Sequence, residues 1–114
     1  MIAVVDDDAA VCDSIRILLE AHDLDVRTYL CGMGFLSENP DVTCVIVDYQ
    51  MPRLNGLDLV AQMRERGSVT PAILMTGTND PTVEQRATQL NVRQFLKKPL
   101  LPQQLLGALG KALE

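Results

Sequence analysis

The sequence lacks any apolar run close to the roughly 20 residues that a transmembrane helix needs. Its first residues pass directly from Met1 into the apolar Ile2–Val5, without the charged region and cleavage site of a signal peptide. The three cysteines, Cys12, Cys31 and Cys44, are an odd number without the spacing of a metal site. These absences predict a cytoplasmic protein with reduced thiols and no membrane partner.

Basic residues are also scarce. Ten Lys and Arg stand against fifteen Asp and Glu, which gives a formal net charge of −5. Because binding to a phosphate backbone depends on clustered Lys and Arg, we expect no nucleic-acid surface on this domain. The sequence has no internal repeat, low-complexity segment or linker, which predicts a single domain over residues 1–114 and no output domain among them.

Short apolar runs alternate with helical patterns five times along the chain. The short connections between them require right-handed crossovers and therefore a parallel sheet. We predict an α/β fold with a five-stranded parallel sheet of order 2-1-3-4-5 and helices on both faces, the flavodoxin-like arrangement. The strands are expected at residues 2–5, 24–30, 43–47, 71–75 and 92–96, and the helices near 11–20, 32–37, 57–63, 81–90 and 105–113.

The fourth helical pattern is the weakest. Asp80 followed by Pro81 is a favourable helix start, a capping residue with proline at the first helical position. The helix that follows has only a thin apolar stripe of Val83, Ala87 and Leu90. We therefore expect it to be the least firmly packed helix of the domain.

Two glycines, Gly107 and Gly110, fall inside the last helical pattern. Each is expected to destabilise the helix by about 1 kcal/mol relative to alanine. They either permit close packing on the sheet or leave a groove for a partner.

Polar residues follow four strands that the predicted order places side by side: Asp6 and Asp7, Asp48, Thr76 and Lys98. The carboxyl ends of parallel strands are where ligands bind in such sheets. Two carboxylates about 5 Å apart repel each other by roughly 3 kcal/mol at an effective dielectric near 20. A hard divalent cation relieves this repulsion, and an incomplete shell of carboxylates completed by water suits Mg²⁺.

A metal alone would not require Lys98 or Thr76. Both are useful if a phosphoryl group is attached to Asp48, because the ammonium would pair with it and the hydroxyl would donate to it. A carboxylate is also a competent nucleophile toward phosphorus. The pattern indicates a site that accepts phosphate.

These residues lie in four segments: Val5-Asp6-Asp7, Asp48-Tyr49-Gln50-Met51-Pro52 with Gly56 beyond it, Met75-Thr76-Gly77, and Phe95-Leu96-Lys97-Lys98-Pro99. Together they resemble the receiver domains of bacterial two-component response regulators, and the resemblance covers the whole chain, in order and with the spacing of the family. Val5-Asp6-Asp7-Asp8 and Met75-Thr76-Gly77 are most similar to receivers that precede a helix-turn-helix output domain of the LuxR type (NarL- or FixJ-like).

The resemblance implies that Asp48 accepts a phosphoryl group from a sensor histidine kinase or a phosphotransfer protein. Asp7 and Asp48 would bind Mg²⁺ directly, the main-chain carbonyl of Gln50 would be the third protein ligand, and Asp6 would help mainly through water. Gln50 and Thr78 stand at positions that tune hydrolysis of the aspartyl phosphate. The chain would thus be a signalling domain that catalyses only its own phosphorylation and dephosphorylation.

The resemblance also implies a switch. Thr76 and Lys98 would bind the phosphoryl oxygens, and Phe95 would turn inward as Thr76 moves toward the phosphate. The Lys98–Pro99 bond is often cis in this family. Output, and a possible homodimer, would use the face formed by the helix at 81–90, the last strand and the last helix.

Other functions fit parts of the pattern. A small phosphatase would use Asp6 as nucleophile and Asp8 as acid, but it leaves Asp7 and Asp48 less well explained, and an N-cap role accounts for Asp8 fully. A flavin-binding domain of the same fold would need a hydroxyl- and glycine-rich loop after the first strand, which is absent. A receiver that works without phosphorylation would not need these carboxylates and Lys98.

Overall fold

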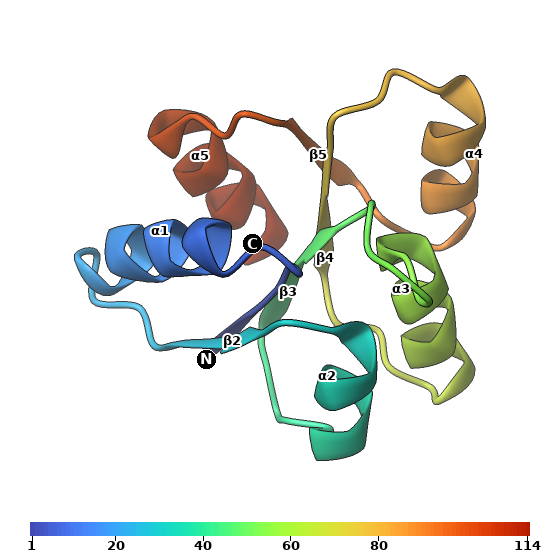
Figure 1. The fold of residues 1–114 in the computed structure, drawn as a ribbon, viewed down its shortest axis with the longest axis horizontal. Helices are drawn as coiled ribbons and strands as arrows, with labels where there is room; N and C mark the ends of the chain where they lie inside the picture. Colours follow the sequence, from blue (N-terminus) through green and yellow to red (C-terminus); the bar gives the residue numbers. More distant parts are fainter.

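Strands and helices alternate along residues 1–114, all of which the computed structural model describes (Figure 1). The five strands form one parallel sheet in the order β2-β1-β3-β4-β5, which confirms the predicted topology. None of the five helices combines the length and apolar character needed to cross a membrane. The elements are β1 (Ile2–Val5), α1 (Ala9–Glu20), β2 (Val26–Tyr29), α2 (Gly32–Glu38), β3 (Cys44–Asp48), α3 (Gly56–Glu65), β4 (Ala72–Thr76), α4 (Pro81–Gln89), β5 (Gln94–Lys97) and α5 (Pro102–Ala112).

The sheet lies between two layers of helices. Helices α1 and α5 cover one face, and α2, α3 and α4 cover the other (Figure 1). Successive side chains of a strand point to opposite faces, so Val4 packs in the core beneath α1 and α5 while Val5 packs in the core on the other side. Because both faces are covered, β1, β3 and β4 are buried along their whole length, which explains their continuous apolar runs.

The last strand begins later than the predicted residues 92–96, at Gln94. Val92 is buried, but it belongs to the turn that ends α4. Its N–H donates to the carbonyl oxygen of Ala87, and Asn91 before it has a positive φ of 64°. The apolar character of Val92 therefore reflects burial under the turn and not a place in the sheet. The other predicted strands are in the right places and differ only at their ends.

Two aspartates cap helices as predicted. The Asp8 carboxylate accepts a hydrogen bond from the Ala10 N–H at 2.9 Å at the start of α1. The Asp80 carboxylate accepts one from the Thr82 N–H at 2.9 Å at the start of α4. Each cap satisfies a backbone donor that the helix itself leaves free.

Helix α4 packs least against the rest of the domain, which confirms the prediction of a weakly held helix. Only Val83 and Ala87 are buried along it. Little apolar area therefore stabilises its position, and its ends matter more than they do for the other helices.

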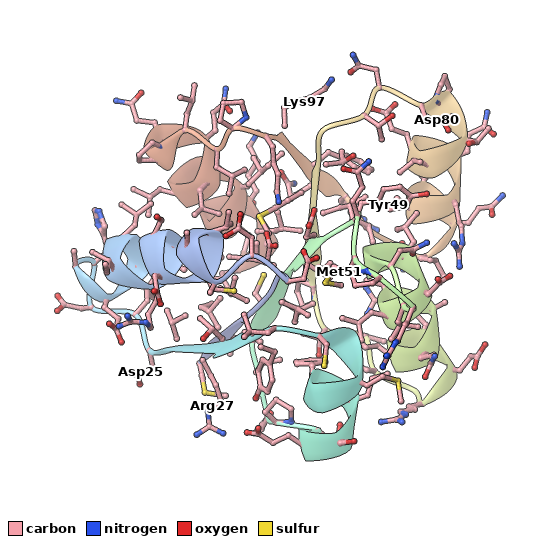
Figure 2. All side chains as sticks on the ribbon, viewed as in Figure 1. Asp25, Arg27, Tyr49, Met51, Asp80 and Lys97 are labelled. Carbon is pink, nitrogen blue, oxygen red and sulfur yellow. The ribbon has the colours of Figure 1, made fainter.

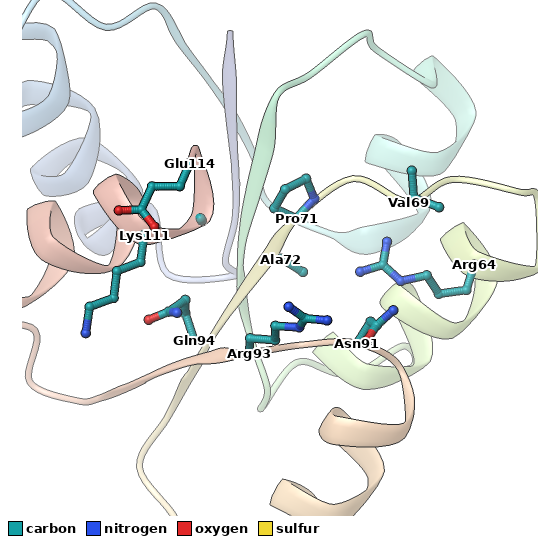
Figure 3. A pocket seen from close by; sticks show the side chains of 10 residues that line it. Arg64, Val69, Pro71, Ala72, Asn91, Arg93, Gln94, Lys111 and Glu114 are labelled. Atoms are coloured by element: carbon teal, nitrogen blue, oxygen red, sulfur yellow. The ribbon is translucent and has the colours of Figure 1, made fainter.

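The carboxyl end of α4 is held by Arg64 of α3. The Arg64 Nε–H donates to the carbonyl oxygen of Leu90 at 2.9 Å, and its Nη1 donates to the carbonyl oxygens of Thr70 at 2.7 Å and Ser68 at 3.2 Å. Burial lowers the pKa of this guanidinium. Arg64 lines a cavity of about 300 Å³ at the amino ends of β4 and β5, so this anchor lies at the opposite end of the sheet from the acidic residues (Figure 3).

The close-packing alternative for Gly107 and Gly110 is wrong. A Cβ added at either position would meet no atom within 4 Å, because both glycines are exposed on α5. Gly107 instead lines a groove between β5 and α5, together with Phe95 and Lys97.

Candidate functional site

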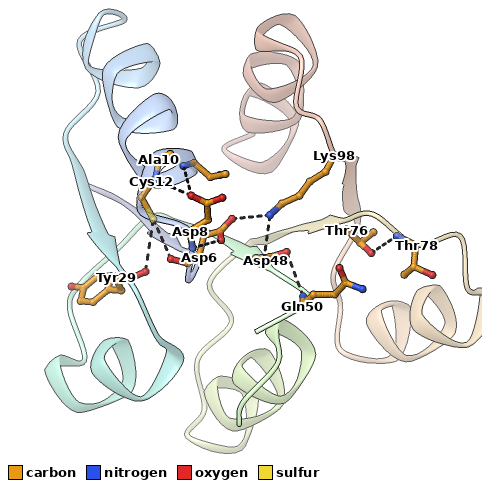
Figure 4. A network of polar contacts seen from close by, with 11 residues as sticks. Asp6, Asp8, Ala10, Cys12, Tyr29, Asp48, Gln50, Thr76, Thr78 and Lys98 are labelled. Carbon is orange, nitrogen blue, oxygen red and sulfur yellow. Dashed lines mark hydrogen bonds and ion pairs between the residues drawn. The ribbon is translucent and has the colours of Figure 1, made fainter. Parts of the chain in front are cut away.

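The predicted site residues meet at the carboxyl edge of the sheet (Figure 4). Asp6 follows the last residue of β1, Asp48 ends β3, Thr76 ends β4 and Lys98 follows β5. The strands are in register, with Val5 beside Val47 on one side of Asp48 and Met75 beside Asp48 on the other. Residues far apart in the sequence therefore reach one pocket.

Three carboxylates gather in this pocket. Asp6, Asp7 and Asp48 each place an oxygen atom within 4.8 Å of the others. Asp6 and Asp48 are buried and Asp7 is exposed, so the cluster opens to solvent on one side. A partly buried, oxygen-only donor set with an open side fits a hard divalent cation that keeps part of its water shell.

Lys98 is the only cation in the pocket. Its Nζ lies 3.0 Å from Asp6 Oδ2 and 3.3 Å from Asp48 Oδ2. Burial alone would lower the pKa of Lys98, but the hydrogen bonds and charges of Asp6 and Asp48 outweigh it and raise the pKa. Burial and the Asp6 charge raise the pKa of Asp48, and Lys98 offsets only part of this effect. One ammonium does not balance the three carboxylates.

Neighbouring backbone fixes the position of Asp48. The Tyr49 N–H donates to the carbonyl oxygen of Met75 at 2.8 Å, and the Gly56 N–H donates to that of Tyr49 at 3.1 Å. The Gln50 N–H donates to Asp48 Oδ1 at 3.3 Å, which places the main chain of Gln50 beside the carboxylate. A Cβ on Gly56 would lie 2.5 Å from the Asp48 carbonyl oxygen, so only glycine fits at this approach.

The hydroxyl of Thr76 is turned toward the following loop. Thr76 Oγ1 accepts a hydrogen bond from the Thr78 N–H at 3.0 Å, on the side away from Asp48 (Figure 4). The Lys98 N–H donates to the Thr76 carbonyl oxygen at 3.1 Å, so the backbones of the two phosphate-binding candidates are joined. The Lys98–Pro99 peptide bond is cis, as the resemblance implies.

Phe95 and Lys97, on either side of the buried Leu96 in β5, point outward. Phe95, the candidate switch residue, is 36% exposed. Lys97 extends into solvent at the end of the strand (Figure 2), so Lys98 alone of the two lysines reaches the carboxylates. Phe95 and Lys97 thus belong to the outer surface of the β5 and α5 region.

Cys12 of α1 also supports the site, which the sequence does not predict. Its Sγ–H donates to the carbonyl oxygen of Asp6 at 3.4 Å, which supports the backbone that carries the acidic pair. Burial, with a contribution from the Asp6 charge, raises the pKa of the Cys12 thiol to about 11. The sequence predicts only a reduced thiol at Cys12, and no local signal could have revealed this contact.

The geometry gives no support to the phosphatase alternative. Asp8 is occupied as the N-cap of α1 and is not free to act as an acid. The Asp6 carboxylate is fully buried, and it accepts hydrogen bonds from the Asp8 N–H at 2.9 Å and from Lys98 at 3.0 Å. Both residues of the proposed nucleophile and acid pair are therefore engaged elsewhere.

Comparison with protein families gives one match over nearly the whole chain. The model of the response regulator receiver domain matches residues 2–110. Among curated proteins, the transcriptional regulatory protein TdiR of Thauera aromatica is 38% identical over 96% of this chain and 49% of its own length. The transcriptional regulatory protein FixJ of Bradyrhizobium diazoefficiens is 33% identical over 98% of this chain and 56% of its own length. The chain thus spans about half the length of these relatives.

Solved structures show the same fold. The Vibrio cholerae chemotaxis protein CheY4 superimposes with a TM-score of 0.92 at 24% identity, covering 98% of this chain and 97% of its own. The response regulator StyR gives a TM-score of 0.91 at 31% identity, with 98% and 58% coverage. The BeF3-activated DrrB receiver domain gives 0.88 at 27% identity, with 98% and 95% coverage.

Proposed function

Because the chain belongs to the response regulator receiver family, we propose that Asp48 accepts a phosphoryl group from a phosphohistidine. The domain is a signalling module whose acidic pocket of Asp6, Asp7 and Asp48 is typical of a receiver phosphoacceptor site. Membership implies a histidine kinase as partner, and we extend this to a sensor kinase or a phosphotransfer protein as the immediate donor. The observation that carries the proposal is the single Lys98 ammonium bridging Asp6 and Asp48.

In the proposed reaction, a carboxylate oxygen of Asp48 bonds to phosphorus while the bond between phosphorus and the donor imidazole nitrogen breaks. The electron pair of that bond stays with this nitrogen, and a proton carried by the other ring nitrogen of the donor makes the leaving imidazole neutral. Lys98 is close enough to Asp48 to pair with the added phosphoryl charge, at 3.3 Å from its carboxylate. The Thr76 hydroxyl would turn from the Thr78 N–H and donate to a phosphoryl oxygen.

We propose that the acidic pocket binds Mg²⁺ for this reaction. Asp7 and Asp48 would bind it directly, with the Gln50 carbonyl as third protein ligand and Asp6 acting mainly through water. When bound, the ion would supply positive charge to the phosphoryl oxygens. The mutual approach of the three carboxylates supports this assignment, because only a cation with more than one charge balances them.

We propose that the phosphorylated domain is read on the face of α4, β5 and α5, with Phe95 turning inward and a homodimer as one outcome. TdiR and FixJ are named transcriptional regulatory proteins, which supports control of transcription as the output. Three unpaired cysteines support a cytoplasmic location, where thiols stay reduced.

The proposal is tested by intact mass after incubation with acetyl phosphate and Mg²⁺. The wild-type protein is expected to gain the mass of one phosphoryl group. Asp48→Asn is expected to gain none, because an amide oxygen is a poor nucleophile toward phosphorus. Asp41→Asn, a matched change at an exposed residue away from the pocket, should behave like the wild type. Phosphoryl uptake that persists in Asp48→Asn would contradict the proposal.

A further inference from the structure

The cavity at the amino ends of β4 and β5 lies at the edge of the sheet opposite the acidic pocket (Figure 3). Its volume of about 300 Å³ is at the lower end of the range for small-molecule sites. Arg64 of α3, Arg93 just before β5 and Lys111 of α5 line it, together with the amides of Asn91 and Gln94. Three cations from three separate segments thus meet in one small space, which we call the basic cavity.

The cations of the basic cavity have no carboxylate partner. None of the ion pairs of the domain includes Arg64, Arg93 or Lys111. Glu114 is the only carboxylate that lines the cavity, and it forms an ion pair with none of them. Three cations and one carboxylate leave a side-chain charge of +2 in the cavity, although the domain as a whole has a charge of −5.

The Arg64 guanidinium still has donors to offer. Its Nε and Nη1 donate to the carbonyl oxygens of Leu90, Ser68 and Thr70, whereas its Nη2 has no acceptor on the protein. These carbonyl groups replace only part of the water that burial removes, so the pKa of Arg64 is lowered. The same bonds hold the guanidinium in place, and a guanidinium binds phosphate and carboxylate oxygens through several N–H groups at once.

The ends of the helices explain only part of this arrangement. Arg64 and Lys111 each stand in the last turn of a helix, where a cation interacts favourably with the negative end of the helix dipole. Arg93 belongs to no helix, because it lies between α4 and β5. The dipole therefore does not explain why Arg93 lines the same cavity, or why the amides of Asn91 and Gln94 lie beside the cations.

We propose that the basic cavity binds a small oxyanion with two negative charges, of the phosphate monoester type. Arg64 Nη2, Arg93 and Lys111 supply positive charge from three segments, and the side-chain amides of Asn91 and Gln94 supply neutral donors. Two charges on the ligand match the +2 of the cavity, and the small volume favours a compact ester over a dinucleotide. The cavity is remote from Asp48, so this assignment does not rest on the proposed function.

NMR titration of the Mg²⁺-free protein tests the assignment. The probes are inorganic phosphate and glycerol 3-phosphate at neutral pH, where a phosphate monoester carries nearly two negative charges. Sodium chloride keeps the ionic strength constant, so that general screening does not change during the titration. The resonances of Asn91, Arg93 and Gln94 are expected to shift to saturation. That of Gln50 is expected to stay in place, because the carboxylates beside it repel anions when no metal is bound.

Charge-removing variants locate the binding. Arg93→Gln and Lys111→Gln remove exposed cations of the cavity, and each is expected to weaken binding about threefold, or roughly tenfold in the double variant. Lys97→Gln is the matched control, because it removes the same charge from an exposed lysine at the other end of β5. Arg64 is left unchanged, since it also anchors the carboxyl end of α4.

Three results would overturn the assignment. The first is the absence of saturable shifts at the basic cavity with both probes. The second is an equal loss of affinity in Lys97→Gln and in the double variant, which would show a general attraction of anions to the protein. The third is a double variant that loses stability to urea but binds as tightly as the wild type, because the cations would then serve only the helix ends. Phosphorylation of Asp48 is measured separately, so failure here leaves the proposed function intact.

Discussion

Helices α3 and α4 begin at the same edge of the sheet and cover the same face, but they are held very differently. The start of α3 has a reciprocal capping box, in which the Asp58 N–H donates to Asn55 Oδ1 at 2.8 Å and the Asn55 N–H donates to Asp58 Oδ2 at 3.4 Å. Gly56, Leu57, Leu59, Val60 and Met63 are buried along it.

The start of α4 is capped by one aspartate, and only two residues of the helix are buried. The contrast matches the proposed function, in which Asp48 is the phosphoacceptor and α4 belongs to the responding face. Asp48 and Gly56 lie on the firmly held side, where the proposed reaction needs an accurate position. Helix α4 has little buried area, and such segments open at low free energy.

The largest effect is expected from adding a methyl group on the rigid side. Gly56→Ala would place a Cβ 2.5 Å from the Asp48 carbonyl oxygen and 3.1 Å from Leu74 Cδ1. Because the backbone at Asp48 cannot move freely, we expect a loss of about 3 kcal/mol in unfolding free energy, measured by urea denaturation. Gly77→Ala is the matched change on the α4 side, where a Cβ would meet nothing within 4 Å, and it should change stability by less than about 0.5 kcal/mol. Equal effects at the two glycines would contradict the contrast.

The next effect concerns the negative charge of Asp48 in the acidic pocket. Because the folded state raises the pKa of Asp48, the folded protein holds this proton more tightly than the unfolded chain. The favourable contribution is therefore present below the unfolded pKa, near 4, and is lost as the pH rises through the folded value. Without metal, Asp48→Asn should be more stable than the wild type at pH 7, and the difference should shrink toward pH 4.

Thermal unfolding across this pH range measures the effect of Asp48→Asn. Adding Mg²⁺ should raise the midpoint of the wild type more than that of the variant, because the variant has lost one of the three carboxylates. A stability difference that does not change with pH would show that the Asp48 charge is not its source.

A smaller effect is expected where the two helices touch. Asp58→Ala removes the side-chain half of the capping box of α3 and the ion pair to Arg86, and should destabilise the protein by about 1 kcal/mol. Arg86→Ala removes only the solvent-exposed pair and should cost about 0.5 kcal/mol or less. Urea denaturation of both variants measures the difference. If Arg86→Ala were as harmful as Asp58→Ala, α4 would be held by α3 more firmly than its few buried residues indicate.

The smallest effect should be a gain in stability. Gly110→Ala on α5 adds a Cβ into open space and improves helix propensity, so the unfolding free energy should rise by up to about 1 kcal/mol. The same change at Gly107 should stabilise the helix and also narrow the groove beside Phe95. A loss of stability in Gly110→Ala would contradict the open space around Gly110, because it would mean that the added methyl group meets a neighbouring atom.

Much of the fold could be predicted because its signals are local. The buried strand β3, with a carboxylate at its end, depends on a few consecutive residues, and so do the caps at Asp8 and Asp80. The weak packing of α4 followed from its thin apolar stripe. Short connections then required right-handed crossovers and a parallel sheet, which the order 2-1-3-4-5 fits.

Other features could not be predicted because they join distant residues. The Arg86 pair with Asp58 spans 28 positions, and Arg64 reaches Leu90 over 26. Val92 has the β-branched apolar side chain typical of a strand, but it is buried in a turn. Such contacts depend on how packed elements face one another, which no sequence window contains.

The amino-acid sequence by itself determined the succession of strands and helices along the chain and the polar residues that follow β1, β3, β4 and β5, because hydrophobic period, capping and chain connectivity act over short distances. Only the tertiary structure decided that one lysine bridges two of three clustered carboxylates, that Thr76 faces Thr78, and that α4 is anchored at one end. Those relations depend on side-chain directions in three dimensions, which packing sets after the elements have come together.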